Sequence, residues 1–493
     1  MVRPGAGVND STAKTDKPAL LQPDICVIGG GAAGLAVASA AAAFGVSVVL
    51  VERRGLGGNR AGLARRALIA AADRAHALRE AGRLGIEAEA PQIREAALHG
   101  HVRRCLAADA VDHSAERLGA LGVRIVSGEA RFASRSTVMA GDQAIKARRV
   151  VIATGSRPDI PDIPGLAELP VLTEDDLHEP ARLPARPVVI GGGETAVALA
   201  QAMGRLGCAV DLVALGPLLP SLDAEAAALV RRALLREGVR LHEQARPVRA
   251  EAMRGGVRLV LATGAEGGET AIEGSHLVLA AGRRPDIATL DLELAGIARD
   301  EGGVAVDRGL RTINRRVYAI GDCAGGMAGG AHYPRPANDH ASLVLRNALF
   351  RLPVRIAPAG YPRVAYSRPE IASLGLSEAQ ARSQAGAIRL LRWPFSQNEG
   401  ARAEGDGEGF VKVVTDRRGR ILGVTIAGAG AEELIAPWSL ALRHGMAVDE
   451  IARTAFPDGA MAATSGQAAL SFHAPLAGKP GIRRLLGFLR RFG

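Results

Sequence analysis

The chain is poor in cysteine, and its few cysteines lie far apart. Cys26, Cys105, Cys208 and Cys323 are separated from one another by tens of residues. This spacing excludes a C-x-x-C redox motif, a zinc knuckle and a disulfide framework. We therefore expect a reduced protein of the cytoplasm, without a metal site.

Aromatic residues are also scarce, at 3% of the chain, whereas glycine supplies 61 of the 493 residues. The hydrophobic share of 48% and the charged share of 23% are nevertheless ordinary for a soluble globular protein. A chain of this length buries two or three hydrophobic cores. The composition excludes a fibrous or largely disordered protein.

Lysine is the third scarce residue. Only Lys14, Lys17, Lys146, Lys412 and Lys479 occur among the 61 basic residues, so arginine carries the formal charge of +10. The arginines are scattered beside Glu and Asp and form no nucleic-acid motif, so we expect no nucleic-acid partner. Residues 25–51 lack any charge and are long enough to cross a bilayer, but their glycines favour a strand, a turn, a helix and a second strand.

A G-x-G-x-x-G motif stands where that turn is expected. Gly29, Gly31 and Gly34, with Ala32 and Ala33 between them, follow an apolar run and precede an Ala-rich helix. The missing side chains let the backbone approach a pyrophosphate at the helix N-terminus, where free N–H groups favour anions. Glu52 follows Gly29 by 23 residues and ends the second strand, where its carboxylate can accept hydrogen bonds from a ribose. The pattern predicts a dinucleotide site.

A second copy of this unit occurs later in the chain. Gly191, Gly193 and Ala196 repeat the motif, with Glu194 and Thr195 inside it. The distance from Gly207 to Ala214 equals that from Gly45 to Glu52, so Ala214 stands where the ribose-binding acid is expected. Two interpretations stay open: a second dinucleotide site, or a domain that keeps the turn and binds nothing tightly.

Further motifs follow in a recognisable order. They are residues 153–158 (Ala-Thr-Gly-Ser-Arg-Pro), 282–286 (Gly-Arg-Arg-Pro-Asp), 318–322 (Tyr-Ala-Ile-Gly-Asp) and 128–130 (Gly-Glu-Ala). With them, the sequence from about Asp24 to the Phe456 region resembles the pyridine nucleotide-disulfide oxidoreductases related to dihydrolipoamide dehydrogenase and mercuric reductase. Residues 366–372 and 409–412, followed by Gly423, resemble the dimerisation domain of that family.

The resemblance implies an α/β fold with two doubly wound, Rossmann-like domains and a C-terminal α+β dimerisation domain. We expect a disordered tail over residues 1–23, an FAD domain over 24–155 and 281–350, and an NAD(P) domain over 156–280. A dimerisation domain over 356–478, which implies a homodimer, and a basic amphipathic tail over 479–493 complete the chain.

The resemblance also implies which residues hold the cofactors, and Asp322 inherits the contact with the flavin's ribitol chain. The FAD set, including its crossover residues, is Gly29, Gly31, Ala32, Ala33, Gly34, Glu52, Arg53, Gly58, Ala130, Ala153, Thr154, Gly155, Arg283, Gly321 and Asp322. The weaker NAD(P) set is Gly191, Gly193, Glu194, Thr195, Ala196 and Gly282.

The sequence departs from the family where that family performs its thiol chemistry. Segment 57–66, about three residues shorter than the family pattern, lacks both cysteines of the redox dithiol. The lysine and glutamate that pair beside the flavin are replaced by Arg65 or Arg66 and by Ala198, so this charge pair is expected to be lost. Phe456 and Met461 stand at the positions of the interface His-Glu pair. We therefore expect no dihydrolipoamide dehydrogenase, glutathione reductase or mercuric reductase activity, and no catalytic residue is identified.

The loop over residues 325–340 is about four residues longer than the corresponding loop of the family, and the tail over 479–493 is basic and amphipathic. In the loop over residues 325–340, His332, Tyr333 and His340 are either proton donors beside the flavin or part of an irregular surface loop, and we favour the loop. In the tail, Ile482, Leu485, Leu486, Leu489 and Phe492 alternate with four arginines at helical spacing. Such a helix binds anionic lipid or packs on its own dimer or a partner, and we favour packing.

The sequence thus favours a soluble FAD-dependent oxidoreductase. NAD(P)H would reduce the flavin by hydride transfer, and the flavin would pass electrons to an unidentified acceptor. The alternative is a non-catalytic FAD-binding subunit of an oxidoreductase complex.

Overall fold

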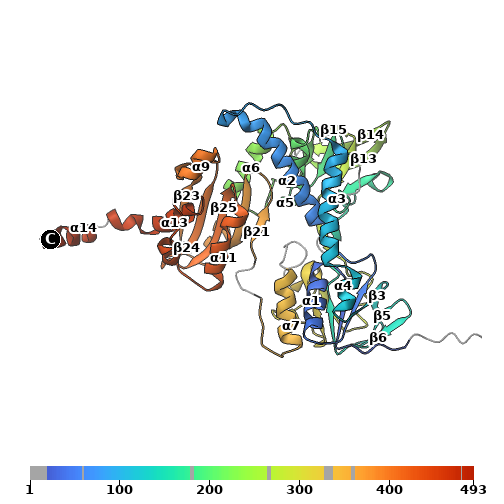
Figure 1. Ribbon diagram of the computed structural model, residues 1–493. Helices are drawn as coiled ribbons and strands as arrows, with labels where there is room; N and C mark the ends of the chain where they lie inside the picture. The colour runs from blue at the N-terminus through green and yellow to red at the C-terminus, as the bar shows by residue number, and fades with distance from the viewer. Residues whose placement is uncertain are drawn as a thin grey trace, which may run out of the picture.

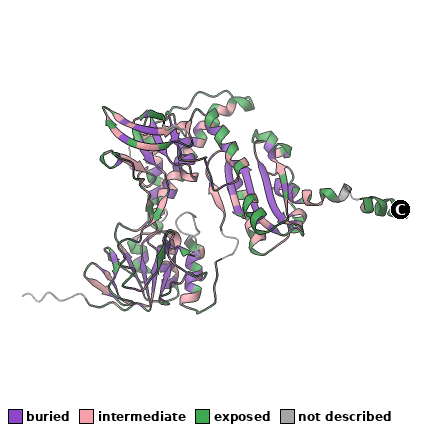
Figure 2. Cartoon of the chain, turned by 180° about the vertical axis from the view of Figure 1, so that it is seen from behind, coloured by how far each residue is buried: buried purple, intermediate pink, exposed green. Residues whose placement is uncertain are grey.

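The chain folds into three sheet-centred units, which Figure 1 shows side by side in the computed structural model. The structure describes residues 19–57, 60–177, 182–263, 268–326, 337–356, 361–478 and 480–492. Strands at the centre of each unit are buried, and most exposed residues lie on helices and turns (Figure 2).

The first unit is a parallel sheet of five strands in the spatial order β3, β2, β1, β7 and β20. The strands are Val123–Ser127, Val48–Glu52, Ile25–Ile28, Arg149–Ile152 and Val317–Ala319. Strand β1 is an apolar run that is buried throughout, as is typical of a parallel sheet covered on both faces. Helices α1 (Ala32–Ala43) and α7 (Ala337–Ala348) pack against each other beside this sheet (Figure 1). An antiparallel sheet of β4 (Ala130–Phe132), β5 (Val138–Ala140) and β6 (Gln143–Ile145) lies between β3 and β7 in the chain.

The second unit repeats this design. Its five parallel strands stand in the order β12, β11, β10, β16 and β9: Arg240–His242, Asp211–Val213, Pro187–Ile190, His276–Leu279 and Val171–Thr173. Helices α5 (Glu194–Arg205) and α6 (Ala224–Arg236) follow β10 and β11. A second antiparallel sheet, of β13 (Arg246–Met253), β14 (Gly256–Thr263) and β15 (Gly268–Gly274), again precedes the fourth strand. The internal repeat expected from the two glycine motifs is therefore a repeat of topology.

A short antiparallel pair joins these two units. Strands β8 (Ser156–Pro158) and β17 (Arg283–Pro285) lie side by side at the two crossings between the units. The remaining helices of this half are α2 (Arg60–Glu80), α3 (Glu95–Asp112) and α4 (Ala115–Ala120), with 3-10 turns at Ala81–Leu84, Leu166–Glu168 and Gly321–Cys323. Strands β18 (Arg299–Asp300) and β19 (Gly303–Val304) form a small hairpin. Helix α2 starts beside the first unit and packs through Leu68 and Ala72 on α5 of the second.

The third unit is an antiparallel sheet in the order β21, β22, β25, β24 and β23: Arg363–Ala365, Glu370–Gly375, Ile421–Gly428, Phe410–Asp416 and Ile388–Pro394. Its helices are α8 (Glu378–Gln384), α9 (Glu399–Glu404), α10 (Ala431–Leu434), α11 (Ala436–Arg443), α12 (Val448–Arg453) and α13 (Ala463–Leu470), with 3-10 turns at Phe395–Gln397 and Ser471–Gly478. Trp438 and Phe395 are buried in its core, and Ala365 and Phe410 pack on the second unit. Helix α14 (Pro480–Leu489) ends the described chain.

This architecture confirms the predicted α/β fold of two doubly wound domains and a C-terminal α+β domain. The domain boundaries stay predictions. Only residues 19–23 of the tail predicted over 1–23 are described, and Leu21 pairs there with Ile145, the last residue of β6. In the part of the chain that the structure describes, no helix combines the length and the apolar character that a membrane span requires.

Candidate functional site

The first glycine motif forms a tight turn between β1 and α1. A Cβ atom on Gly29, whose φ is +107°, would lie 2.4 Å from the carbonyl oxygen of Ala153, and one on Gly34 would lie 1.9 Å from that of Gly29. Both positions therefore require glycine, because any side chain would push the strand, the turn and the helix apart. Gly31 is the N-cap of α1, and a Cβ there would meet no atom within 4 Å. Ala32 and Ala33 then form the first turn of the helix.

The N-terminus of α1 has the features of an anion-binding site. No side chain caps the helix, and its first turn holds no acidic residue. The first N–H groups of an α-helix have no partner within the helix, and its dipole favours negative charge there. The open space at Gly31 leaves these groups accessible. The cradle fits a pyrophosphate, and thus the FAD that the sequence predicts.

Glu52 lies at the carboxyl end of β2, next to this turn. Its carboxylate accepts the backbone N–H of Gly30 at 2.5 Å and that of Arg54 at 2.7 Å. The backbone carbonyl of Glu52 accepts the N–H of Gly128 at 2.9 Å, which places the segment leading to Ala130 beside it. These bonds orient the carboxylate at the position where a ribose hydroxyl is expected.

Arg53 holds the rim of the same region together. It donates to Glu129 at 2.9 Å and also bonds Asp286, so it connects segments on both sides of the predicted FAD site. Thr289 and Arg53 hydrogen-bond Glu129 and lower the pKa of its carboxyl.

The second FAD motif approaches the first from the neighbouring strands. Gly321 lies so close to α1 that a Cβ on it would be 3.4 Å from Cβ of Ala33. Its N–H donates to Nδ1 of the buried His340 at 3.2 Å, and Asp322 accepts the hydroxyl of Ser156 at 2.7 Å. Ala153, Thr154 and Gly155 form the turn after β7. The structure thus brings together predicted FAD residues from five segments, 29–34, 52–53, 128–130, 153–155 and 321–322, whereas Gly58 lies outside the described residues.

A chain of polar contacts runs from Asp322 to the second glycine motif. Ser156 accepts from Nε of Arg283 at 2.7 Å, and Nη1 of Arg283 donates to Glu174 and to Asp175 at 2.8 Å. Glu174 accepts from Nη1 of Arg65 at 2.9 Å, and the same Arg65 nitrogen lies 3.4 Å from the Thr195 hydroxyl. Only 7% of the Glu174 side chain is exposed. The two motifs are therefore coupled through buried charges.

Burial alone would lower the pKa of the Arg283 guanidinium. The hydrogen bonds to Asp175 and Glu174 outweigh this effect and raise the pKa well above its ordinary value, so Arg283 stays charged.

The sequence predicts that the family's lysine-glutamate pair is absent. The structure pairs Arg65 on α2, one of the two arginines expected at the lysine position, with Glu174 after β9.

The second glycine motif matches the first in geometry. A Cβ on Gly191 would lie 2.2 Å from the carbonyl oxygen of Ala280, as one on Gly29 would lie against Ala153. Gly193 is the N-cap of α5, with no atom within 4 Å of its Cβ position, and Ala196 is buried against the turn. Gly282, the predicted residue of the return crossing, accepts the N–H of Asp159 through its carbonyl at 2.8 Å.

Charge distinguishes the two motifs. Glu194 puts a carboxylate in the first turn of α5, where α1 has none. Its carboxylate bonds Arg363 of β21, and Arg363 also donates to Ser221 at 2.7 Å. After β11, Ala214 is buried and Leu215 is 71% exposed. The backbone of this turn fits a dinucleotide, while Glu194 opposes a pyrophosphate and no acid stands at Ala214 to bind a ribose.

Helix α2 begins within segment 57–66, where the family has its redox dithiol. Arg66 lies away from Glu174: it pairs with Glu432 at 2.8 Å and lies over the ring of Tyr366 at 4.5 Å.

All four cysteines are unpaired. Burial raises the pKa of the Cys26 thiol to about 12 and that of Cys208 to about 11, with a further contribution from Glu95, so neither forms a thiolate readily.

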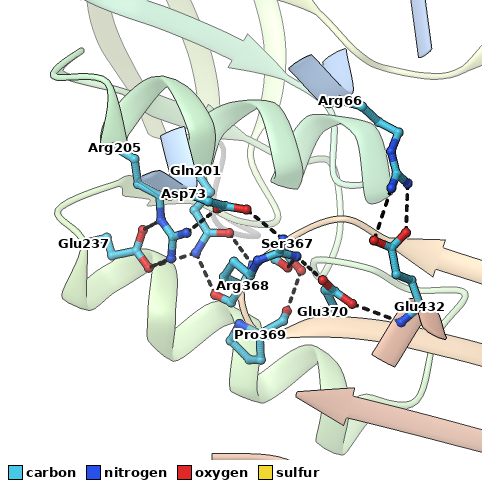
Figure 3. A network of polar contacts seen from close by, with 10 residues as sticks. All are labelled: Arg66, Asp73, Gln201, Arg205, Glu237, Ser367, Arg368, Pro369, Glu370 and Glu432. Carbon is cyan, nitrogen blue, oxygen red and sulfur yellow. Dashed lines mark hydrogen bonds and ion pairs between the residues drawn. The ribbon is translucent and has the colours of Figure 1, made fainter. Parts of the chain in front are cut away.

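A buried polar network fastens α2 to α5 and to the third unit (Figure 3). Arg205 donates to Asp73 and to Glu237, each at 2.7 Å, and Asp73 also pairs with Arg368 at 2.7 Å. Gln201 accepts the backbone N–H of Arg368 and donates to its carbonyl. Figure 3 shows how these side chains converge from α2, α5 and the segment before β22. The network anchors α2 at Asp73, about two turns after Arg65, which lies beside the second glycine motif.

The two residues at the positions of the family's interface His-Glu pair pack on the hydrophobic core. Phe456 and Met461 pack on the apolar core of the third unit, and the Phe456 ring closes on Gly466. His332 and Tyr333 lie outside the described residues. His340 does not lie in the irregular loop predicted for it: it lies in the first turn of α7 and is buried. Where side chains are described, no three His, Cys, Asp or Glu residues gather as metal ligands.

Sequence reasoning missed Glu174, Asp175, Ser156 and Arg363. One signal was present for the first two, because residues 174–176 (Glu-Asp-Asp) form an acidic run directly after an apolar one. Strand β9 pairs with β16, whose sequence lies about a hundred residues later, so only the folded sheet brings this run to Arg283.

Comparisons with known proteins point to one family. The family described as pyridine nucleotide-disulphide oxidoreductase matches residues 23–342, and its dimerisation domain matches residues 361–469. A mercuric reductase of Streptomyces lividans is 32% identical over 466 residues, which are 92% of this chain and 97% of that protein. Dihydrolipoyl dehydrogenase 3 of Pseudomonas aeruginosa is 31% identical, over 91% of this chain and 98% of that protein.

Solved structures show the same fold. LpdA of Mycobacterium tuberculosis superposes with a TM-score of 0.80 at 27% identity, covering 92% of this chain and 99% of that one. The flavoprotein disulfide reductase RclA of Escherichia coli superposes with a TM-score of 0.78 at 22% identity, covering 90% of this chain and 98% of that one.

Proposed function

The chain belongs to the pyridine nucleotide-disulphide oxidoreductase family, and from this premise we propose that it is an FAD-dependent NAD(P)H oxidoreductase that works without a thiol pair. Electrons would pass from NAD(P)H through the flavin to an acceptor of unidentified chemistry. The observation that carries the proposal is the contact chain from Asp322 through Arg283, Glu174 and Arg65 to Thr195. It joins an uncapped anion cradle to a second glycine turn of the same geometry.

FAD, when bound, supplies two-electron chemistry that needs no cysteine. The residues of this chain would bind and orient it. The free N–H groups of α1 would receive the pyrophosphate, Glu52 would accept hydrogen bonds from the ribose, and Asp322, which Ser156 orients, would accept them from the ribitol chain. Arg65 and Glu174 would replace the family's charge pair in the neighbourhood of the flavin. Gly191, Gly193 and Ala196 would shape the nicotinamide nucleotide site.

We also propose a homodimer, formed through the third unit, which carries the dimerisation-domain match. The unpaired cysteines are consistent with a reducing compartment such as the cytoplasm. The lack of a thiol at segment 57–66 argues against the activities named for the curated relatives.

A second candidate function rests on the charge at α5. Glu194 lies in the first turn, and no acid stands at Ala214, so the second glycine turn lacks favourable charge for a dinucleotide. Under this alternative the chain is a non-catalytic FAD-binding subunit. Both candidates require bound FAD.

Anaerobic rapid mixing separates them. The FAD-loaded protein is mixed with NADH or NADPH, and the flavin absorbance near its visible maximum is followed. We expect bleaching by at least one of the nucleotides. If neither bleaches the flavin at millimolar concentration, the oxidoreductase proposal is wrong and the subunit is supported; if the protein neither carries nor takes up FAD, both are wrong.

A further inference from the structure

Helix α14 (Pro480–Leu489) is the one α-helix of the described chain that has no buried residue. It follows the 3-10 turn Ser471–Gly478 and extends away from the third unit (Figure 1), and it is exposed along its length (Figure 2). Leu485, Leu486, Phe488 and Leu489 are each at least 50% exposed, and Phe492 is 74% exposed. Large apolar side chains gathered on one projecting helix mark an interaction surface.

The helix has two opposite faces. At helical spacing, Ile482, Leu485, Leu486, Leu489 and Phe492 fall on one side, and Phe488 extends that side and contacts the Phe492 ring at 5.0 Å. Arg483, Arg484, Arg490 and Arg491 fall on the other. The helical hydrogen bonds continue to Arg490, whose N–H donates to the carbonyl of Leu486 at 3.0 Å, so the arginine pairs at both ends share one face.

The charge of this segment has a single sign. After Asp458 the sequence contains no Asp or Glu, while Lys479 and the four arginines follow. A partner for this helix must therefore offer both an apolar medium and negative charge. An anionic lipid surface offers both at the right depth, because the apolar face enters the acyl boundary while the arginines stay at the headgroups.

We propose that α14 is an interfacial anchor that lies on anionic lipid bilayers and holds the protein at a membrane surface. An apolar face and a basic cluster together give the two signals that stable, reversible anchoring needs. The length of the apolar face suits a helix lying in the interface rather than crossing it. The proposal departs from our preference, from the sequence, for packing on protein.

A second copy of the chain is the competing occupant. The apolar groove of about 570 Å³ between α1 and α7 is lined by Phe44, Leu345 and Phe350, and its remaining lining residues include Arg346 and no carboxylate. That groove offers the apolar side chains of α14 a surface but meets its arginines with a like charge. Lipid headgroups meet them with the opposite charge, so charge complementarity favours the bilayer.

Vesicle flotation of the full-length protein tests the anchor. The probes are vesicles of phosphatidylcholine alone and vesicles of phosphatidylcholine mixed in equal parts with phosphatidylglycerol. We expect the protein to float with the anionic vesicles, to remain unbound with the neutral ones, and to be released by high salt. The double variant Leu485→Glu, Leu489→Glu removes the apolar signal, and Arg490→Glu, Arg491→Glu removes the basic one; each should weaken binding about tenfold or more.

A matched control changes the same charge elsewhere. Arg417→Glu, Arg418→Glu reverses two exposed arginines in the turn between β24 and β25, and it should leave flotation unchanged. Circular dichroism and size-exclusion chromatography check that all variants keep their fold and oligomeric state. The proposal is wrong if the wild-type protein does not float with anionic vesicles, or if the control variant loses binding as the two α14 variants do. It is also wrong if the α14 variants lower the oligomeric state while their flotation is unaffected.

Discussion

Glu174 accepts a hydrogen bond from Arg65 at 2.9 Å with one carboxylate oxygen, while its other oxygen accepts from Arg283. One buried carboxylate thus balances two arginines, one on α2 and one on β17. Asp175 shares Arg283, so the cluster contains equal numbers of positive and negative groups. Removing Glu174 leaves the two arginines with a single carboxylate between them.

We expect Glu174→Ala to lower the free energy of unfolding by about 3 kcal/mol, since breaking a buried ion pair leaves an uncompensated charge. Urea denaturation followed by circular dichroism measures the loss. The matched control is Glu251→Ala, whose pair with Arg249 lies on the surface and should contribute less than about 1 kcal/mol. If the two substitutions lower the free energy of unfolding equally, the Glu174 cluster contributes no more to stability than a surface ion pair does.

Glu52 provides a test of the first nucleotide site. Its carboxylate is oriented by the N–H groups of Gly30 and Arg54, and we expect it to accept hydrogen bonds from the FAD ribose. Because a hydrogen bond to a charged group contributes about 1.5–3 kcal/mol, Glu52→Gln should raise the dissociation constant of FAD by about tenfold or more. Fluorescence titration of the apoprotein measures it. Glu116→Gln, on the exposed side of α4, is the control, and unchanged affinity in Glu52→Gln would contradict the assignment.

Glu194 and Arg363 test the second site in opposite directions. Glu194→Gln removes a negative charge from the first turn of α5, so we expect NAD(P)H to bind about threefold to tenfold more tightly. Arg363→Gln leaves that charge without its partner and should weaken binding. The dependence of the flavin reduction rate on nucleotide concentration gives both values. If neither substitution changes the affinity for NAD(P)H, the dinucleotide binds elsewhere and the assignment of this site is wrong.

Asp211 predicts an acid-dependent loss of stability. Burial alone would raise the pKa of this carboxyl, but hydrogen bonds and charges from His242 and Arg240 hold it at about 2, below the ordinary value of 3.8. A depressed carboxylate pKa stabilises the fold above the unfolded value, and this contribution is lost as the pH falls through about 4 towards 2. At neutral pH it amounts to about 2 kcal/mol.

The variant Asp211→Asn checks this dependence. It should be less stable than the wild type by about 2 kcal/mol at neutral pH, and the difference should narrow as the pH falls below about 4. Urea denaturation at a series of pH values measures the difference. A difference that stays constant across the acidic range would assign the effect of Asp211 to packing rather than to charge.

Local signals made much of the fold predictable. The close approach of Gly34 to Gly29 is imposed within one strand, turn and helix, so the glycine spacing carries it. The family resemblance and the α/β architecture are confirmed for the same reason. The absence of a dithiol is a property of the sequence itself.

Long-range charge pairing could not be predicted in this way. The acidic run 174–176 is visible in the sequence, but its partners Arg65 and Arg283 lie about a hundred residues away on either side. Likewise, the amphipathic pattern of 480–492 predicts a helix but gives no sign of whether the body of the chain covers it. Both the charge pairing and the exposure of the helix depend on how the units assemble, so only the folded structure shows them.

The most direct test of the central claim is an anaerobic titration of the FAD-loaded, full-length protein with the reduced nucleotide that bleaches its flavin. A flavin that works without a redox disulfide takes up two electrons, so we predict complete bleaching at one equivalent of NAD(P)H per flavin, with no long-wavelength thiolate–flavin band. A requirement for two equivalents, or the appearance of that band, would reveal a second redox centre and contradict the account.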